Sequence, residues 1–305
     1  MQCGAVCYRP ERAAPNWGEA RCLVGEADVH GDAWHVAPLY ETLLVLDWAK
    51  GPAGTGEWDN RYRLDATRIP DQHTGRLAES WEQPDPLTVI FHVRKGVYWH
   101  DKPPMNGREL TADDFVYNFH RVTGTGSGFT ETGQHAEFMG YGVIESITAT
   151  DKYTVVFKLK EDVTGKTFWG GLSLMQNIAL GYYSDIYPPE VIEEHGDAKD
   201  WRNLVGTGPY ELTDFVEGSS VTYTKNPDYW GYDEKYPENR LPYIDRLRAL
   251  IMPEVATQLA GLRTGRLDTL GGGSAWLRSL DQLESLQQTN PELVIWSFTR
   301  RSDNG

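Results

Sequence analysis

The sequence predicts a mixed α+β fold, within the broad α/β class. Apolar and polar residues alternate at 88–93 and again at 153–159, which is typical of half-buried strands. Residues 110–124 instead repeat their apolar side chains at helical spacing. Strands and helices do not follow each other in the regular strand–helix–strand order of a parallel sheet. A length of 305 residues permits one large domain or two ordinary ones.

The first elements surround a glycine-rich stretch. Residues 38–48 form a short apolar element, and the glycine-rich sequence after it reads as a loop. We expect irregular chain at 75–86, because prolines stand at positions 84 and 86. The alternation then begins at residue 88, and Lys95-Gly96 turns the chain after the predicted strand.

The helix predicted at 110–124 carries signals at both ends. Thr111 can cap the first turn, and Asp114 three residues later completes a capping-box pattern. Gly124 is suited to end the helix. Asp113 and Asp114 could also be catalytic acids, but their position in a first turn favours capping.

The second half of the chain continues the mixed pattern. Alternation on both sides of the turn sequence ATDK predicts a hairpin, and proline and glycine delimit a short helix. The later elements follow from the same two periodicities. In chain order they are a hairpin at 143–161, a helix at 187–196, two strands within 206–231, a strand at 243–254, helices at 255–267 and 275–288, and a strand at 293–298.

Residues 91–104 combine two histidines, an aspartate and three cations, and so raise the question of a catalytic or metal site. His92 is in strand phase with Arg94 and opposite Phe91, which favours a solvated or hydrogen-bonded histidine. Asp101 opens a turn and is expected to accept from nearby backbone N–H groups. A metal-dependent phosphohydrolase needs further histidines and an aspartate on surrounding helices, and the sequence does not space them that way.

Other catalytic patterns are weak. The sequence GTGPY at 206–210 lacks the Lys-Ser/Thr of a phosphate loop, and TLGGGSAW at 269–276 could equally be a ligand-facing or a plain glycine loop. Neither a Gly-x-Ser-x-Gly elbow nor a His-Glu-x-x-His pattern is present. Carboxylates are plentiful, so a glycosidase pair stays open, but no two of them stand out. An enzyme is the less favoured interpretation.

Composition excludes several classes. A net charge of −15 disfavours nucleic acid, and no apolar run approaches the roughly 18 residues of a membrane span. Cys3, Cys7 and Cys22 are the only cysteines, and their spacing is not that of a zinc site, so we expect no metal or cofactor. The 11 tryptophans suit both a core and a concave ligand site.

An ordered set of motifs carries a family resemblance. The motifs are Tyr40-Glu41, Leu77 to Trp81, Phe91 to Val97, His100 to Pro104, Thr111 to Tyr117, Gly206 to Tyr210, Asn226 to Trp230 and Gly265 to Asp268. Together they resemble the family 5 extracellular solute-binding proteins, which serve peptide, nickel and related ABC importers. The resemblance spans about residues 38–298 and is specific because of the order, although each motif alone is weak. Lys102 replaces the turn glycine usual in the family.

The resemblance implies the first lobe of a type II periplasmic-binding-protein-like fold. Residues 28–44 and 186–298 are expected to form a mixed-sheet main domain, with 45–185 as an inserted α+β subdomain. Residues 1–27 do not match the family, and 299–305 read as a truncated crossover. Members of the family continue far beyond Gly305, so we expect the second lobe to be absent from this chain.

The implied function is an extracytoplasmic module that binds a peptide or similar small solute without catalysis and delivers it to ABC permease subunits. Peptide is the favoured ligand class, and oligosaccharides and nickel chelates are less favoured. Membrane contact is expected only through the transporter or a lipid anchor, and export is inferred from the family alone. The alternative is a carbohydrate-active hydrolase or sugar-binding module that uses aromatic residues and a carboxylate pair.

Position within the family also suggests residues of the site. Those expected to contact ligand are Asp28, Phe129, Tyr141, Ser274 and Trp276. Those expected to fix turns and packing instead are Trp81, Arg94, His100 and Trp230.

Overall fold

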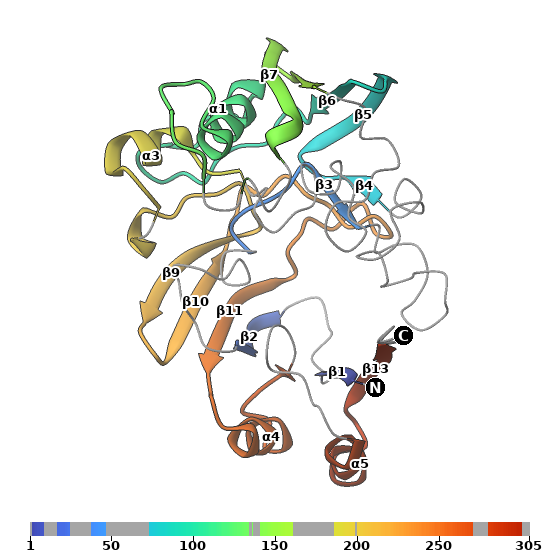
Figure 1. Cartoon of the computed structure of the whole chain (residues 1–305). Coiled ribbons are helices and arrows are strands. Elements are labelled where there is room, and N and C mark those ends of the chain that lie inside the picture. Colours follow the sequence, from blue (N-terminus) through green and yellow to red (C-terminus); the bar gives the residue numbers. More distant parts are fainter. Residues whose placement is uncertain are drawn as a thin grey trace. The chain divides into compact units, whose positions relative to one another are not determined.

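The structure is a computed structural model that describes residues 2–8, 17–24, 38–46, 73–133, 136, 141–160, 186–198, 200–270 and 280–300. The chain divides into two compact units (Figure 1). Unit 1 comprises Met1–Pro38, Pro209–Pro227 and Gly231–Gly305, and unit 2 comprises Leu39–Gly208 and Asp228–Trp230.

Unit 2 is built on a four-stranded antiparallel sheet in the order β5-β6-β8-β7. Helix α1 lies beside β7 and β8 (Figure 1), and the pair β3–β4 forms a separate small sheet. The elements of unit 2 are β3 (Leu44–Leu46), β4 (His73–Gly75), β5 (Ala78–Asp85), β6 (Thr88–Val93), α1 (Ala112–Thr123), η5 (Tyr141–Val143), β7 (Ile144–Asp151), β8 (Thr154–Leu159), α3 (Pro189–His195) and η6 (Trp201–Asn203).

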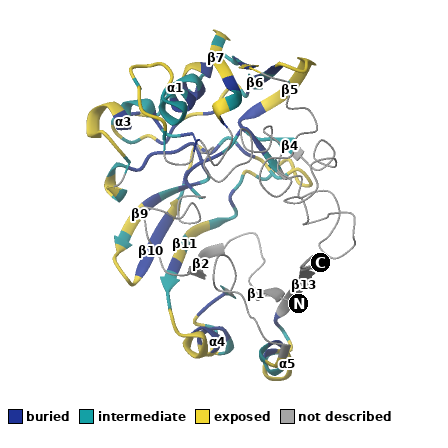
Figure 2. Cartoon of the chain, in the orientation of Figure 1, coloured by how far each residue is buried: buried dark blue, intermediate teal, exposed yellow. Residues whose placement is uncertain are grey.

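The core of unit 2 lies between the sheet and α1. The inward face of β6 places Phe91 against Phe157 of β8, with ring centroids 5.6 Å apart, while Phe119 of α1 meets Phe157 at 5.0 Å. Ile90 and His92, on the other face of β6, are only partly buried (Figure 2). The predicted alternation in 88–93 is therefore confirmed.

Unit 1 contains a seven-stranded mixed sheet in the order β13-β1-β12-β2-β11-β10-β9. Strand β2 runs parallel to β11 and β12, and the other pairs are antiparallel. A leucine cluster joins the two helices, with Leu262 and Leu286 fully buried. The elements are β1 (Gln2–Tyr8), β2 (Trp17–Val24), β9 (Tyr210–Val216), β10 (Ser220–Lys225), β11 (Ile244–Ile251), α4 (Val255–Arg263), β12 (Thr269–Leu270), α5 (Leu280–Thr289) and β13 (Val294–Arg300).

The ends of α1 follow the sequence signals. The Thr111 N–H donates to the Asp114 carboxylate at 2.8 Å, which is the reciprocal half of a capping box. Gly124 ends the helix in the left-handed conformation at φ 68°. The hairpin, the helix at 189–195 and the strands β9, β10, β11 and β13 also lie where the sequence predicts them.

Strand β5 is the clearest error of the sequence prediction. Residues 75–86 were expected to be irregular, yet 78–85 pair with β6. Pro84 is tolerated because β5 is an edge strand and the register shifts between Glu82 and Asp85.

The observed units have other limits than the predicted domains. The inserted subdomain was placed at 45–185, whereas the compact unit 2 begins at Leu39 and runs to Gly208. The unmatched residues 1–27 contribute β1 and β2 to the sheet of unit 1. Helices long and apolar enough for a bilayer crossing are absent from the described part of the chain.

Candidate functional site

A buried carboxylate, Glu41, organises the interior of unit 2. Its side chain is 0% exposed and accepts four hydrogen bonds from different segments of the chain. Oε1 accepts from Arg76 Nε at 2.7 Å and from the Tyr229 hydroxyl at 2.9 Å. Oε2 accepts from Thr207 Oγ1 at 3.0 Å and from Trp230 Nε1 at 3.1 Å. We call these five residues the Glu41 network.

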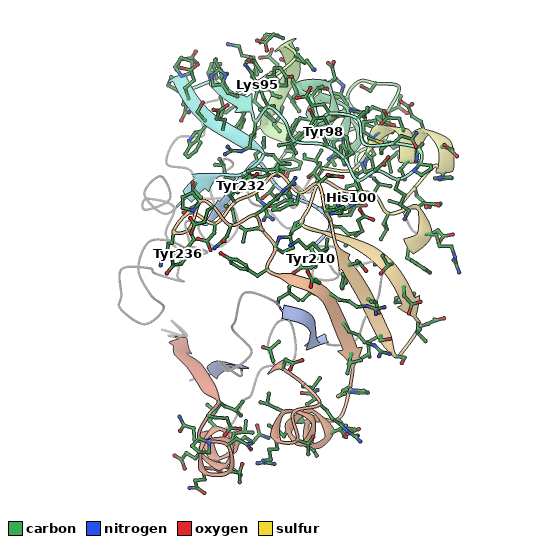
Figure 3. All side chains as sticks on the ribbon, turned by 180° about the vertical axis from the view of Figure 1, so that it is seen from behind. Lys95, Tyr98, His100, Tyr210, Tyr232 and Tyr236 are labelled. Atoms are coloured by element: carbon green, nitrogen blue, oxygen red, sulfur yellow. The ribbon has the colours of Figure 1, made fainter. Side chains whose placement is uncertain are left out.

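His100 fixes the loop that carries Thr207. The Gly206 N–H donates to Nδ1 at 3.2 Å, so the proton of the neutral ring lies on Nε2 and is donated to the Gly208 carbonyl at 3.0 Å. Burial lowers the pKa of His100 to about 4, because the imidazolium would lose its hydration. Figure 3 places His100 in the segment that follows β6, beyond Tyr98.

Glycine is required at position 206 by close packing. A Cβ there would lie 1.9 Å from the carbonyl oxygen of Leu39, closer than any real contact. The next glycine, Gly208, donates its N–H to the same oxygen at 2.7 Å. The sequence GTG thus lies against the backbone that precedes Glu41, and serves packing in place of phosphate binding.

Arg94 and Trp230 extend the network to β6. The Arg94 guanidinium lies 4.7 Å from the Trp230 ring, and its Nε donates to the Arg76 carbonyl at 2.8 Å. Trp81 packs against the apolar core of unit 2. The scaffold interpretation of Trp81, Arg94, His100 and Trp230 agrees with these contacts.

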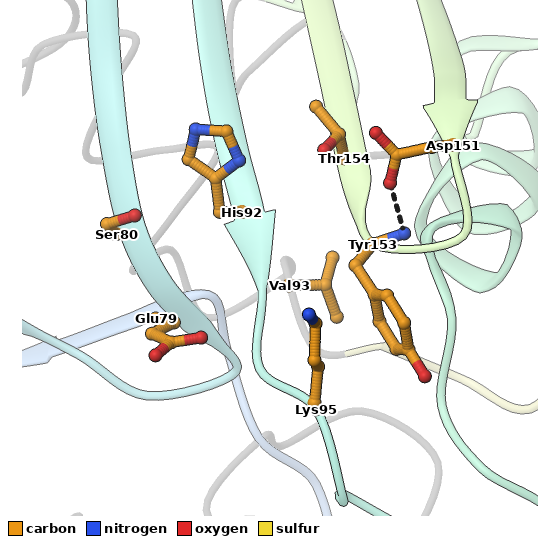
Figure 4. A pocket seen from close by; sticks show the side chains of 8 residues that line it. All are labelled: Glu79, Ser80, His92, Val93, Lys95, Asp151, Tyr153 and Thr154. Atoms are coloured by element: carbon orange, nitrogen blue, oxygen red, sulfur yellow. Dashed lines mark hydrogen bonds between the residues drawn. The ribbon is translucent and has the colours of Figure 1, made fainter.

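One hollow lies over the outer face of the four-stranded sheet (Figure 4). Its volume is about 330 Å³, and its lining is mostly polar. The lining groups take part in interactions within the protein. The Asp151 carboxylate accepts a hydrogen bond from the Tyr153 N–H at 2.8 Å in the hairpin turn, and the Lys95 Nζ lies 5.3 Å from the Tyr153 ring. The hollow therefore lacks the enclosed apolar walls of a typical small-molecule site. Its lining residues are Glu79, Ser80, His92, Val93, Lys95, Asp151, Tyr153 and Thr154.

Phe129 is presented by a turn of unusual backbone. Gly126, Ser127 and Gly128 all have positive φ, at 125°, 45° and 84°, and the Phe129 N–H returns to the Gly126 carbonyl at 2.9 Å. A positive φ at a serine is uncommon and often marks a functional loop. The Phe129 ring meets Tyr117 of α1 edge-on at 5.3 Å and stays partly exposed.

The other predicted ligand contacts fall in two groups. Tyr141 is 2% exposed and packs against Phe119 at 5.8 Å, so its ring belongs to the core of unit 2. Asp28, Ser274 and Trp276 lie outside the described residues. The ligand contacts of all four residues stay predictions.

Sequence reasoning missed the role of Glu41. The motif that contains it was recognised, but its partners are 35 to 189 positions away in the chain. A usable signal was present, because Glu41 stands within the apolar run PLYETLLVL. An acidic residue in a buried run must be paired.

Comparisons with known proteins identify the family. The profile of the bacterial extracellular solute-binding proteins, family 5 Middle, matches residues 72–301. The dipeptide-binding protein of Escherichia coli is 31% identical over 197 residues, which are 61% of this chain and 34% of that protein. The heme-binding protein A of Haemophilus influenzae is 29% identical over 245 residues, 77% of this chain and 42% of that protein.

Solved structures share the fold. The periplasmic binding protein DppA from Helicobacter pylori, in complex with the peptide STSA, has a TM-score of 0.63 and 23% identity over 91% of this chain and 50% of that one. HbpA2 from Haemophilus parasuis has a TM-score of 0.64 and 20% identity over 90% of this chain and 50% of that one. The chain thus spans half or less of the length of these relatives. Because the family profile covers most of the sequence, the chain belongs to the bacterial extracellular solute-binding proteins of family 5.

Proposed function

We propose that the chain is part of the solute-binding component of an ABC importer. It holds a peptide or a similar small solute outside the cytoplasm and delivers it to the membrane permease without catalysis. The observation that carries the proposal is the family match over residues 72–301. The chain spans 34% and 42% of the two curated relatives, so the activity of the whole protein is part of the proposal.

The peptide class rests on the relatives. Several bear the names of dipeptide-, di/tripeptide- or oligopeptide-binding proteins, two of them periplasmic by name. Other relatives carry other solutes in their names or titles, namely heme, mannopinic acid and Fe(III)-EDTA. One scaffold therefore serves several ligand chemistries, and the scaffold motifs themselves do not select the solute.

The internal hydrogen bonds of the buried polar groups in unit 2 support a binding role. The buried polar groups Glu41 and His100 are engaged internally: Glu41 accepts four hydrogen bonds, and both ring nitrogens of His100 are bonded to backbone. Neither group is free to transfer a proton to a substrate. The carbohydrate-active hydrolase receives no support from the relatives, which are binding proteins by name.

Ligand contact is proposed for each residue separately: for Phe129 in unit 2, and for Asp28, Ser274 and Trp276 in unit 1. Phe129 suits this role because its turn has positive φ at three successive residues and its ring is partly exposed. Tyr141 contributes by supporting α1 from inside the core.

The test is the identity of a retained solute. The complete open reading frame is expressed from its genomic locus, and native mass spectrometry identifies what copurifies. We expect a small solute that the protein returns chemically unchanged, and we expect Phe129→Ala to reduce its occupancy. Cleavage of any bond in the recovered solute contradicts the proposal.

A further inference from the structure

Four arginines in the described part of unit 2 are partly buried, and two of them are neutralised by carboxylates; the four are Arg76, Arg94, Arg108 and Arg121. Arg76 donates to Glu41, and Arg108 donates to both Asp114 and Glu190. For Arg108 the bonds to Asp114 Oδ2 and Glu190 Oε2 measure 2.9 and 2.8 Å. Burial by itself lowers the pKa of an arginine, but these carboxylates raise the pKa of Arg76 and of Arg108 above the ordinary value.

Arg121, near the end of α1, differs from both. Its Nη2 donates to Asn118 Oδ1 at 3.2 Å, and its Nε is enclosed without an acceptor. Within the described ranges, no carboxylate forms an ion pair with this guanidinium. Burial lowers its pKa, and only tyrosines act in the opposite sense. A guanidinium has five N–H donors, so most of the donor capacity of Arg121 is not used by the residues that the structure describes.

The surroundings of Arg121 are aromatic. Its guanidinium lies 5.1 Å from the Tyr187 ring, which in turn meets Tyr40 at 4.6 Å. Tyr117, one turn earlier on α1, faces the Phe129 ring. Arg121, Tyr117 and Tyr187 are each partly exposed, although the Nε atom of Arg121 is itself enclosed. Tyrosines offer a ligand both apolar ring area and a hydroxyl group.

We propose that Arg121, with Tyr117 and Tyr187, is a binding site for a carboxylate group. A carboxylate matches the planar fork of a guanidinium and supplies the counter-charge that described residues provide for Arg76 and Arg108 but not for Arg121. The class of ligand is a small molecule with a free carboxylate. Its assignment as the transported solute rests on the proposed function, whereas the site itself does not.

The competing explanation is that Arg121 merely packs on Tyr187. Arg94 provides the matched control, because it also lies over an aromatic ring, at 4.7 Å from Trp230. Two Arg94 atoms, however, donate to the backbone: Nε to the Arg76 carbonyl at 2.8 Å and Nη2 to the Gly75 carbonyl at 3.4 Å, so the Nε of Arg94 has the acceptor that the Nε of Arg121 lacks. The two arginines thus share the cation–π contact and differ in unfilled donors.

The test follows the arginine Nε–H signals of the full chain by ¹H–¹⁵N NMR. Sodium acetate is titrated against sodium chloride at equal ionic strength, and Arg121→Gln assigns the Arg121 signal. We expect a saturable, acetate-specific shift at Arg121 and none at Arg76 or Arg108. Arg94→Gln keeps the acetate response, and Arg121→Lys, which retains the charge without the fork, weakens it.

Two outcomes overturn the inference: no acetate-specific shift at Arg121, or an equal shift at Arg108. The first leaves only the packing contact with Tyr187, and the second indicates non-specific screening. The wild-type titration decides the matter even if Arg121→Gln folds poorly, since Arg121→Lys can then assign the signal. A parallel titration with trialanine and its C-terminal amide separates the two proposals. Acetate binding without trialanine binding sustains the carboxylate site and contradicts its assignment to a peptide solute.

Discussion

The strongest test of the scaffold is the substitution Glu41→Gln, which changes one buried oxygen to an amino group. Each carboxylate oxygen of Glu41 receives one donor that can never accept: Arg76 on Oε1 and Trp230 on Oε2. Thr207 and Tyr229, the other two partners, carry hydroxyls that can rotate and accept instead. Glutamine therefore leaves one donor-only group facing its NH₂, whichever way the amide is turned.

The magnitude follows from burial. The Glu41 side chain is 0% exposed and that of Arg76 is 26% exposed, so solvent screens the pair weakly. Breaking such a pair costs about 3–5 kcal/mol, a large share of the roughly 5–15 kcal/mol that stabilises a domain. Glu190→Gln is the matched control. The Glu190 side chain is 35% exposed, and Arg108 retains its hydrogen bonds to Asp114 when the Glu190 carboxylate is removed. We expect this control to cost about 1 kcal/mol or less.

Urea unfolding at pH 7, followed by circular dichroism, measures both free energies of unfolding. Hydrogen exchange locates the effect, because loss of the Glu41 network is expected to speed exchange at the Gly208 amide, which is bonded to the Leu39 carbonyl at 2.7 Å. A loss below 1 kcal/mol for Glu41→Gln, or a loss equal to that of Glu190→Gln, refutes the central role of Glu41.

Three further predictions use other parts of unit 2. His100 has a pKa of about 4 in the folded chain against about 6.5 unfolded, so the unfolded state binds the proton first. The contribution of His100 to the free energy of unfolding is complete above pH 6.5 and falls by about 3 kcal/mol as the pH drops to 4. Urea unfolding at several pH values measures this loss. The substitution His100→Gln is expected to flatten the dependence of stability on pH. Gly206→Ala forces a Cβ to within 1.9 Å of a backbone oxygen, and costs more than about 2 kcal/mol in a thermal melt, whereas Gly142→Ala, with open space around it, is neutral. Tyr141→Ala removes a core ring and costs about 3–5 kcal/mol, while Phe129→Ala costs about 1 kcal/mol or less and lowers solute occupancy; the reverse order contradicts the assigned roles.

Local signals explain why some elements were predictable. The first and last residues of helix α1 are set by local signals, because the capping pair Thr111–Asp114 and the terminal Gly124 act within a few residues. Strand β5 was missed because its strand character depends on pairing with β6, and because a proline at a free edge breaks no ladder bond. The parallel pairing of β2 with β11 joins residues more than 200 positions apart, which no local pattern encodes.

The side chains of the candidate sites were also hard to predict, because their tertiary contacts are not encoded in local sequence patterns. Arg121 lies near the C-terminus of α1, where a cation is favoured, and this is a local property. That no described carboxylate pairs with Arg121 is a tertiary property, which depends on what α3 and the Tyr187 segment bring to α1. Likewise Phe129 and Tyr141 were predicted for the same role, but only folding reveals that one ring is partly exposed and the other belongs to the core.

The Glu41 network links three of the family motifs, namely Tyr40-Glu41, Gly206 to Tyr210 and Asn226 to Trp230. The chain passes between the two units after residues 38, 208, 227 and 230. A member of the network lies within three residues of each passage: Glu41 after the first, Thr207 before the second, and Tyr229 and Trp230 between the last two. One buried carboxylate therefore anchors every connecting segment at its unit 2 end. Three motifs that look like separate short signatures are thus parts of one set of contacts, and replacing Thr207, Tyr229 or Trp230 removes a donor to Glu41.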